Sequence, residues 1–304
     1  MNHFVSVVIP TFNRARVLGR SIKSVLNQTY TNFELIIVDD CSNDNTAAVI
    51  KSFHDERIVH ITHEKNKGGF AARNTGIKAA RGKYIAFQDS DDEWLPSKLS
   101  KQMKLFDSAS PDIGVVYTSF WLICKETRTL FPFSGARKTE GNIHNALLEA
   151  NFVGIPTAVV RKECFEKVGL FEALPCLQDW SLWLKISKYY CFKHVNEPLV
   201  NAYWQSDSIS INNMYAYLLA RKYILNTYFG EISKKPKLLR QHYFEIGTFL
   251  CLNGEIGEGR TYFFDAMKIN PLDAKLLLSV FASTIGLGAY NKITSVYLRA
   301  KGQE

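Results

Sequence analysis

The sequence predicts an α/β fold in which helices flank a mostly parallel, mixed sheet, followed by an all-helical C-terminal extension. Over the first half of the chain, short apolar runs alternate with amphipathic stretches, a pattern typical of strand–helix units and a parallel sheet. After about Asn212 the strand patterns disappear, and amphipathic segments alone predict helices. The composition, 46% hydrophobic and 22% charged, is that of a globular chain.

The first 110 residues predict four strands separated by helices. Phe4–Pro10 is rich in β-branched residues and ends at a proline, which predicts a buried strand. Apolar residues then recur at helical spacing from Val17 to Leu26, and Asn43, Asp44 and Asn45 supply helix-start chemistry. The remaining strands are expected at Phe33–Val38, Ile58–Thr62 and Tyr84–Gln88, and the remaining helices through Phe53 and at Gly69–Ala80.

Residues 111–211 have a mixed character, and residues 212–304 form the expected helical extension. In the middle we expect strands at Val115–Ile123, Phe192–Val195 and Leu199–Trp204 and helices at Gly141–Ala150 and Asp179–Tyr189. In the extension we expect helices at Tyr215–Phe229, Lys237–Leu252, Glu255–Ile269 and from Pro271 onward. The segment GEIGEGRTYFFDAMKINP resembles one tetratricopeptide-type helix. Since a stable solenoid needs about three repeats and no second copy is found, we interpret it as a helical tail.

Charge and cysteine usage narrow the class of protein. The formal net charge of +8 favours anionic partners, which include nucleotides, nucleic acid and an anionic membrane surface. The six cysteines form neither a C-x-x-C pair nor a zinc pattern, which predicts reduced thiols in a cytoplasmic protein. We expect no signal peptide in MNHFVSVVIP. The longest apolar segment, Leu276–Tyr290, is shorter than the roughly 18 residues that a spanning helix needs.

Three acidic clusters follow expected strands or begin an expected helix: Asp39-Asp40, the run Asp89-Ser90-Asp91-Asp92, and Asp179 in LQDWSLW. In a parallel sheet, ligands bind beyond the carboxyl ends of the strands. Carboxylates gathered there repel one another, and a divalent cation offsets that cost. Each cluster alone is equally consistent with a turn or a helix cap. Their order and strand context together favour a binding site.

The sequence resembles a family 2 glycosyltransferase with a GT-A fold. The resemblance rests on VSVVIPTFNRARVLGRSIKSVLNQTYTNFELIIVDDCSNDNT, on NKGGFAARNTGIKAARGKYIAFQDSDDEWLPSKL and on GLFEALPCLQDWSLWLKI. These stretches cover most of residues 4 to 190. The resemblance does not extend to residues 215 to 304. It implies a nucleotide-sugar half at 1–110 and an acceptor half at 111–211, followed by the helical extension at 212–304.

The resemblance gives a role to each matching residue. Asp40 matches a residue that hydrogen-bonds a uracil-type base, and Asp89 and Asp91 match the Asp-x-Asp motif that meets the ribose and the metal-bound diphosphate. Asp179 matches the general base, with Gln178 and Trp180 on the acceptor side. A divalent cation, Mg²⁺ or Mn²⁺, is expected at Asp89, Asp91 and Asp92. The full set of expected donor-binding residues is Pro10, Thr11, Phe12, Asn13, Asp39, Asp40, Lys67, Gly68, Arg73 and Asp89.

One loop departs from the family pattern. Many relatives carry a histidine just before a Ser-x-Ser segment, whereas this loop reads YWQSDSIS with Gln205 or Ser206 in that place. Either Asp207 or a water would then take the place of the histidine as a ligand to the metal.

The resemblance implies an inverting glycosyltransferase that moves a sugar from a nucleotide-sugar, expected to be a UDP-sugar, to a hydroxyl during cell-surface polysaccharide synthesis. The expected acceptor is a glycan or lipid-linked glycan, and no nucleic-acid partner is expected. Lys292, Arg299 and Lys301 beside the apolar tail fit either peripheral contact with the inner face of an anionic membrane or simple packing of a last helix.

Two alternative functions fit these residues less well. A nucleotidyltransferase has no need of an acceptor-side base in LQDW, and PTFNRAR is a poor version of its Gly-rich basic loop. A non-catalytic nucleotide- or glycan-binding module has no need to keep all three acidic clusters.

Overall fold

The computed structural model describes residues 3–132, 138–204, 214–286, 288 and 290. The chain forms two compact units. The first contains Met1–Ala173 and Gln178–Ser206, and the second contains Leu174–Leu177 and Asp207–Glu304. The boundary expected after residue 211 lies outside the described residues.

The first unit alternates strands and helices in its N-terminal part, as the hydrophobic pattern predicts. Its elements up to residue 131 are β1 (Val5–Thr11), α1 (Leu18–Leu26), β2 (Phe33–Asp39), α2 (Thr46–Lys51), β3 (Ile58–Thr62), α3 (Gly69–Ala79), β4 (Tyr84–Phe87), β5 (Glu93–Trp94), α4 (Lys98–Ser108), β6 (Ile113–Cys124) and β7 (Thr127–Phe131). The later ones are α5 (His144–Glu149), the 3₁₀ turn η1 (Ile155–Thr157), β8 (Val159–Arg161), α6 (Lys162–Val168), α7 (Gln178–Ile186) and β9 (Cys191–Tyr203).

These strands form one mixed sheet in the described part of the first unit. Nine strands take part, in the order β3-β2-β1-β4-β8-β6-β9-β5, with β7 paired to β6. β1 runs parallel to β2 and β4, and β2 parallel to β3, whereas β8 is antiparallel to β4 and β6. The predicted mixed sheet is therefore confirmed. Because β1, β2 and β4 are parallel, the residues that follow them lie at one edge of the sheet.

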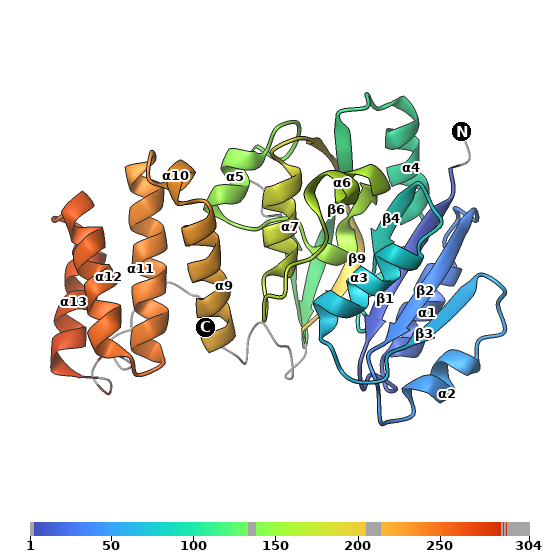
Figure 1. Ribbon diagram of the computed structural model, residues 1–304, viewed down its shortest axis with the longest axis horizontal. Helices are drawn as coiled ribbons and strands as arrows, with labels where there is room; N and C mark the ends of the chain where they lie inside the picture. Colours follow the sequence, from blue (N-terminus) through green and yellow to red (C-terminus); the bar gives the residue numbers. More distant parts are fainter. Residues whose placement is uncertain (1–2, 133–137, 205–213, 287, 289, 291–304) are drawn as a thin grey trace. The chain divides into compact units, whose positions relative to one another are not determined.

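Helices cover both faces of this sheet (Figure 1). Val5, Val7 and Ile9 point to a core shared with α1, α2 and α4. Val8 points to the other face, where α3 packs so closely that a Cβ added at Gly76 would lie 2.3 Å from Val8 Cγ1. Glycine at 76 therefore fixes how near α3 approaches the sheet.

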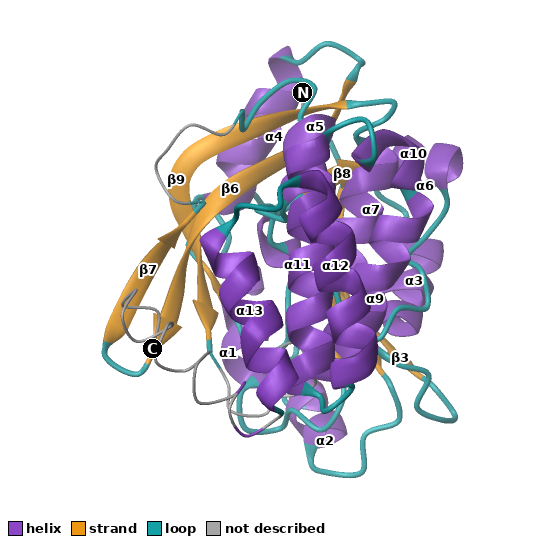
Figure 2. Ribbon diagram, turned by 90° about the vertical axis from the view of Figure 1, so that its left-hand side faces the viewer, coloured by secondary structure: helices purple, strands orange, loops and turns teal. Residues whose placement is uncertain are grey.

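The acceptor half differs from the expectation in its strands. The two short strands expected near 192–195 and 199–204 are one strand, β9, which pairs in parallel with β6 and lies beside it in Figure 2. Pro198 has no backbone N–H and interrupts the apolar pattern, and the register shifts around its partner Ser119 let the pairing continue. The sequence patterns did not indicate α4, β5, β7, β8 or α6.

The second unit is helical in its described residues. Its helices are α9 (Met214–Thr227), α10 (Phe229–Ile232), α11 (Pro236–Leu252), α12 (Ile256–Ile269) and α13 (Ala274–Ile285). A buried cluster of Cys251, Phe263, Ala266, Leu276 and Ala282 holds α11, α12 and α13 together. The predicted helical extension is thus confirmed. In the described residues, no helix combines the length and apolarity needed to cross a membrane.

Candidate functional site

The loops after β1 and β2 are tied to each other at the edge of the sheet. Asn13 N donates to Ser42 Oγ at 2.8 Å, and Asn43 N donates to Asn13 Oδ1 at 2.9 Å. Asn13 has φ 52°, a left-handed conformation that asparagine tolerates better than most residues. Beside it the side chain of Phe12 is 43% exposed. The expected nucleoside loop therefore presents an aromatic ring on a backbone that the β2 loop supports.

Thr11 and Asp39 are paired neighbours at the ends of β1 and β2, one residue beyond Pro10 and Val38. Asp39 is buried, and its Oδ1 accepts a hydrogen bond from Ser42 N at 2.9 Å. The buried Oγ1 of Thr11 has no hydrogen-bond partner within the described residues. Since buried hydroxyls are normally satisfied, a ligand or water is expected there.

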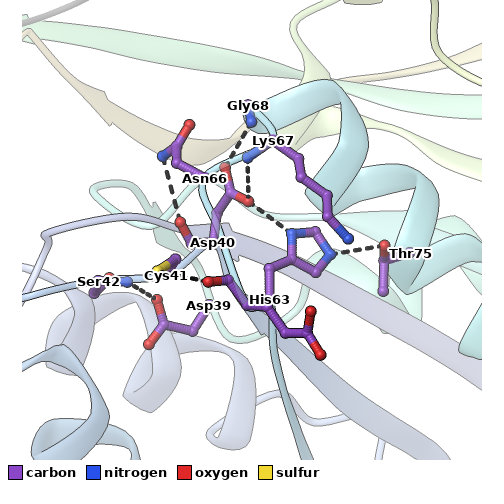
Figure 3. Close-up of polar contacts among 10 residues, drawn as sticks. Asp39, Asp40, Cys41, Ser42, His63, Asn66, Lys67, Gly68 and Thr75 are labelled. Atoms are coloured by element: carbon purple, nitrogen blue, oxygen red, sulfur yellow. Dashed lines mark hydrogen bonds and ion pairs between the residues drawn. The ribbon is translucent and has the colours of Figure 1, made fainter.

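Asp40 anchors the loop that precedes α3 (Figure 3). Its Oδ1 accepts hydrogen bonds from Lys67 N at 2.9 Å and from His63 Nδ1 at 2.6 Å, and its Oδ2 accepts one from Gly68 N at 2.7 Å. The other ring nitrogen of His63 lies 2.9 Å from Thr75 Oγ1. Three of the roughly four acceptor positions of the carboxylate are thus filled by described residues, and the expected contact with a base would use the remaining position on Oδ2.

Two side chains of α1 hold the Asp-x-Asp turn that follows β4. Ser21 Oγ donates to the carbonyl oxygen of Asp89 at 2.9 Å, and Arg20 donates through Nη2 to the carbonyl oxygen of Asp91. The guanidinium of Arg20 also lies 3.7 Å from the ring centroid of Tyr203, at the end of β9. The turn is therefore fixed through its backbone carbonyl groups.

Asp92 differs from the other two carboxylates of this turn. It is buried, and its Oδ1 accepts a hydrogen bond from Tyr203 N at 3.0 Å. Burial raises the pKa of Asp92 well above its ordinary value, and the negative charges of Asp89 and Asp91 raise it further. The charges of Asp89 and Asp91 therefore disfavour ionisation of Asp92, and a bound cation would offset that repulsion.

No group of three or more His, Cys, Asp or Glu side chains is arranged as a metal site within the described residues. Mg²⁺ and Mn²⁺ sites that bind nucleotides commonly take only one or two carboxylates and draw their other ligands from phosphates and water. Asp89 and Asp91 are the carboxylates expected to form that kind of site. Burial is the main cause of the raised pKa of Asp92, and the charges of Asp89 and Asp91 add to it. Gln205 and Ser206, which stand where many relatives carry a histidine, and Asp207, the expected substitute ligand, lie outside the described residues.

Arg73 links the donor side of the site to the acceptor side. Its Nη2 donates to Asp89 Oδ1 at 2.8 Å, and its Nη1 donates to Gln178 Oε1 at 3.0 Å. The Arg73 side chain is 16% exposed. One guanidinium thus joins the Asp-x-Asp turn to the first residue of α7, next to Asp179.

Asp179 lies in the first turn of α7 and is partly buried. Its Oδ1 accepts a hydrogen bond from Trp180 N at 2.8 Å, and its Oδ2 accepts one from Asn151 Nδ2 at 2.9 Å. Burial raises the pKa of Asp179 above its ordinary value, against the opposing effect of these two hydrogen bonds and of Arg73. A carboxylate of raised pKa is a stronger base, which suits proton abstraction.

Trp180, expected on the acceptor side, has its indole in the core. The residue is 1% exposed, and Nε1 donates to the carbonyl oxygen of Leu147 at 2.6 Å. Trp183 is equally buried and donates to the carbonyl oxygen of Val153 at 2.8 Å. Both indoles therefore anchor α7 in the core. Trp180 contacts the carboxylate of Asp179 through its backbone N–H.

Sequence reasoning missed the residues that support the site rather than form it. Asn151, Ser21, Arg20, His63 and Tyr203 each hydrogen-bond or stack on an expected site residue or its turn. Histidine in a loop, or asparagine before an apolar run, carries no periodic signal.

Comparisons with known proteins identify the family of the chain and the type of its fold. The family model of glycosyl transferase family 2 matches residues 6–169. The UDP-Glc:alpha-D-GlcNAc-diphosphoundecaprenol beta-1,3-glucosyltransferase WfgD of Escherichia coli is 32% identical over 212 residues, which are 70% of this chain and 81% of that protein. In a longer relative, the match spans only 32% of the relative's length.

Solved structures of similar fold include S. aureus TarS 1–349 in complex with UDP-GlcNAc, with a TM-score of 0.67 and 18% identity over 97% of this chain and 92% of that one. The mannosyltransferase PcManGT of Pyrobaculum calidifontis, in complex with GDP-Man and Mn²⁺, has a TM-score of 0.57 and 18% identity, and covers 92% of this chain and 79% of that one. The fold is of the GT-A type, and the family match covers more than half of the sequence. The chain belongs to glycosyl transferase family 2.

Proposed function

We propose that this glycosyltransferase, which acts on nucleotide sugars, is an inverting, metal-dependent enzyme that moves a sugar from a UDP-sugar to a hydroxyl of a glycan or lipid-linked glycan. The observation that carries the proposal is the position of Arg73, which donates to both Asp89 and Gln178. The residue expected at the donor phosphates and the segment expected to carry the base therefore share one hydrogen-bonded network.

The donor is assigned to the edge formed by the ends of β1, β2 and β4. Support comes from the exposed ring of Phe12 and from the buried hydroxyl of Thr11, which has no hydrogen-bond partner in the described part of the chain. The remaining acceptor position on Asp40 suits an N–H of a base such as uracil. WfgD is named for UDP-Glc and TarS binds UDP-GlcNAc, which favours UDP over the GDP of PcManGT.

Asp89 and Asp91 are the residues proposed to hold Mg²⁺ or Mn²⁺, with Asp92 as a buried neighbour that also anchors Tyr203. When bound, the cation would neutralise negative charge on the departing diphosphate. The Mn²⁺ in the PcManGT complex supports this assignment. Arg73 contributes a fixed positive charge at the same place, since its guanidinium already pairs with Asp89.

The proposed reaction is a single displacement at the anomeric carbon. Asp179 accepts the proton of the acceptor hydroxyl, and the hydroxyl oxygen forms the new bond to carbon. The bond from that carbon to the diphosphate breaks, and its electron pair leaves with the nucleoside diphosphate. Because attack and departure take place on opposite faces and no carboxylate acts as nucleophile, the configuration inverts, as in inverting glycosidases. Asn151 holds Asp179 in place throughout.

The acceptor is proposed to lie at a membrane surface, with the protein on the cytoplasmic side. WfgD is named for a diphosphoundecaprenol-linked acceptor, which supports a lipid-linked substrate. On α13, Leu276 and Ala282 belong to the helical core. The opposite face leaves four apolar side chains 42% to 59% exposed: Leu277, Leu278, Phe281 and Ile285. An apolar helix face of this kind suits shallow insertion into a lipid interface.

A donor panel tests the proposed reaction. UDP-, GDP- and dTDP-sugars are supplied with Mn²⁺, with Mg²⁺ or with EDTA, and release of nucleoside diphosphate and thermal stability are both measured. UDP with either cation should raise the melting temperature, and EDTA should abolish the rise. Equal stabilisation in EDTA removes the metal from the proposal, and absence of any shift removes the donor site.

A separate experiment tests the membrane contact. The double variant Phe281→Ser, Ile285→Ser should lose co-sedimentation with anionic lipid vesicles while it keeps its transfer activity toward a water-soluble acceptor. Unchanged partition between vesicles and buffer would rule out α13 as the contact.

A further inference from the structure

A buried acid–imidazole pair lies beneath the loop that precedes α3, outside the reaction chemistry described above. His63 Nδ1 and Asp40 Oδ1 are 2.6 Å apart, and both side chains are nearly enclosed, at 5% and 3% exposure. His63 Nε2 lies 2.9 Å from Thr75 Oγ1 in α3. Figure 3 shows the imidazole between the carboxylate and the hydroxyl. Both ring nitrogens of His63 are therefore engaged.

The direction of these contacts follows from the groups around Asp40. Lys67 N and Gly68 N both donate to its carboxylate, so the carboxylate acts there as an acceptor. The hydrogen shared with His63 therefore belongs to Nδ1. In the neutral ring, Nε2 then accepts from the hydroxyl of Thr75. His63 thus fixes the orientation of Asp40 from below, and Thr75 fixes the ring.

Asp40 in turn sets the path of the loop. Besides the two amides that its carboxylate holds, its carbonyl oxygen accepts from Asn66 Nδ2 at 3.3 Å. Gly68 has φ 87°, and its carbonyl oxygen accepts from the amides of Ala71 and Ala72 in the first turn of α3. Any rotation of the Asp40 carboxylate would therefore move both the loop and the start of the helix that carries Arg73.

We propose that His63 is a positioning residue for the nucleotide donor. Through Nδ1 it holds Asp40, and Asp40 holds the loop Asn66–Gly69 in the shape that receives the donor. His63 itself touches neither the donor nor the reacting atoms. The proposal rests on the donor role of this loop put forward above, and predicts that loss of His63 weakens donor binding and leaves the chemical step intact.

Two substitutions separate the two ring nitrogens. In His63→Asn the side-chain amide nitrogen is bonded to Cγ, as Nδ1 is, so the variant keeps the donor to Asp40 and loses the contact with Thr75. In His63→Gln the amide reaches toward the Nε2 position and leaves the Nδ1 position empty. Thr75→Val is the matched control, because it removes only the hydroxyl on the Nε2 side. Donor KM, kcat and melting temperature are measured for all three variants.

We expect His63→Gln to raise the donor KM about tenfold or more, the scale of a lost hydrogen bond to a charged group, with kcat within about twofold of wild type. His63→Asn and Thr75→Val should keep the donor KM within about threefold. Equal donor KM values for the Asn and Gln variants would overturn the proposal, as would a fall in kcat at unchanged KM. Failure of both His63 variants to fold assigns His63 to stability alone and also overturns it.

Hydrogen exchange measured without any donor keeps this test separate from the proposed function. Amides in residues 66–72 should exchange faster in His63→Gln than in wild type or His63→Asn, with amides of β1 unchanged. If no nucleotide stabilises the wild type, the donor assignment fails while this exchange pattern still reports on the loop. An exchange pattern identical in all three proteins refutes the positioning role. If His63→Gln alone fails to fold, a wild-type-like donor KM and loop exchange in His63→Asn support the proposal, and a tenfold rise in its KM refutes it.

Discussion

Arg73 Nη1 donates to Gln178 Oε1 at 3.0 Å, so a residue in the second turn of α3 contacts the first residue of α7, 105 positions later in the sequence. The same guanidinium donates to Asp89. Because Nη1 and Nη2 belong to one rigid, planar guanidinium, Arg73 fixes the distance between the Asp-x-Asp turn and the segment that carries Asp179.

Arg73→Lys tests this bridge. Lysine keeps the positive charge but presents a single ammonium in place of the planar fork, so it cannot make both contacts in the same geometry. We expect kcat/KM to fall about tenfold to a hundredfold, the range for a lost charge-assisted hydrogen bond. Arg57→Lys is the control, because Arg57 pairs with Asp55, which is not among the residues assigned to the site. Comparable losses in both variants would contradict a role specific to Arg73.

Asp179→Asn tests the general base. Asparagine occupies the same volume at the start of α7 and favours helix starts about as well as aspartate, but it is not a comparable base. The variant should melt within a few degrees of wild type and still show the metal-dependent UDP shift, whereas sugar transfer falls on the order of a hundredfold or more. Transfer within a few-fold of wild type would move the assignment to Asp92 or Asp207.

Asn151→Ala tests how Asp179 is tuned. The amide of Asn151 donates to the carboxylate and lowers its pKa, against the larger effect of burial. Removing this donor should raise the pKa of Asp179 further. Since the base works only when deprotonated, the acid limb of the kcat profile should move to higher pH. A limb that stays in place, measured between pH 5 and 9, would show that Asn151 does not act on the titrating group.

Glu34 predicts an acid-dependent contribution to stability. Burial acts to raise the pKa of Glu34, but hydrogen bonds from Ser6 and Arg81 outweigh it and lower the pKa overall. A carboxyl whose pKa is lowered on folding stabilises the protein above its unfolded pKa of about 4.3, and this stabilisation is lost as pH falls through the folded value. Glu34→Gln should lower the melting temperature at pH 7 and show a smaller loss near pH 3. The control Glu126→Gln, at an exposed position, should leave the melting temperature unchanged at both pH values. A loss of melting temperature in Glu34→Gln that is the same at pH 7 and pH 3 would contradict the proposed effect of ionisation on stability.

Gly76→Ala tests the approach of α3 to the sheet. The added methyl would meet Val8 Cγ1 at 2.3 Å, and overpacking of this kind costs about 1–3 kcal/mol. Val8→Ala in the same chain should restore part of the loss, because it removes the obstructing methyls. Gly19→Ala in α1 is the control: its new methyl would lie 3.8 Å from Val49, and alanine favours a helix over glycine by up to about 1 kcal/mol. Equal free energies of unfolding in urea for Gly76→Ala and Gly19→Ala would refute the close contact between Gly76 and Val8.

The hydrophobic pattern was enough to predict β1, β2, β3 and β4. It also predicted the edge where the polar residues after them meet, because the carboxyl ends of parallel strands lie at the same edge of a sheet. The antiparallel part was harder. β8 has only three residues, Val159–Arg161, too few to show an alternation. β9 was divided at Pro198 because the sequence does not reveal a register shift in its partner strand.

The site shows the same limit. Asp89 and Asp179 are recognised from a motif and its flanks, whereas their supporting residues are far away in sequence. Asn151 is 28 positions from Asp179, and Arg73 is 105 from Gln178. Asp40 was expected to hydrogen-bond a base of the donor, and the structure shows that it also accepts hydrogen bonds from His63 and from the loop amides. Such contacts are tertiary, and no local pattern encodes them.

The helical unit takes four of its residues, Leu174–Leu177, from within the catalytic half of the sequence. Cys176 belongs to one buried cluster with Ala216 and Ala220 of α9, against which Leu177 and Tyr217 pack. A recombination event with a single breakpoint near residue 207 would replace the C-terminal helices but keep residues 174–177. These residues would then lack the apolar side chains of α9 that they pack against. We therefore expect residues 174–177 and the chain from Asp207 onward to vary together, and a functional chimera has to exchange both segments.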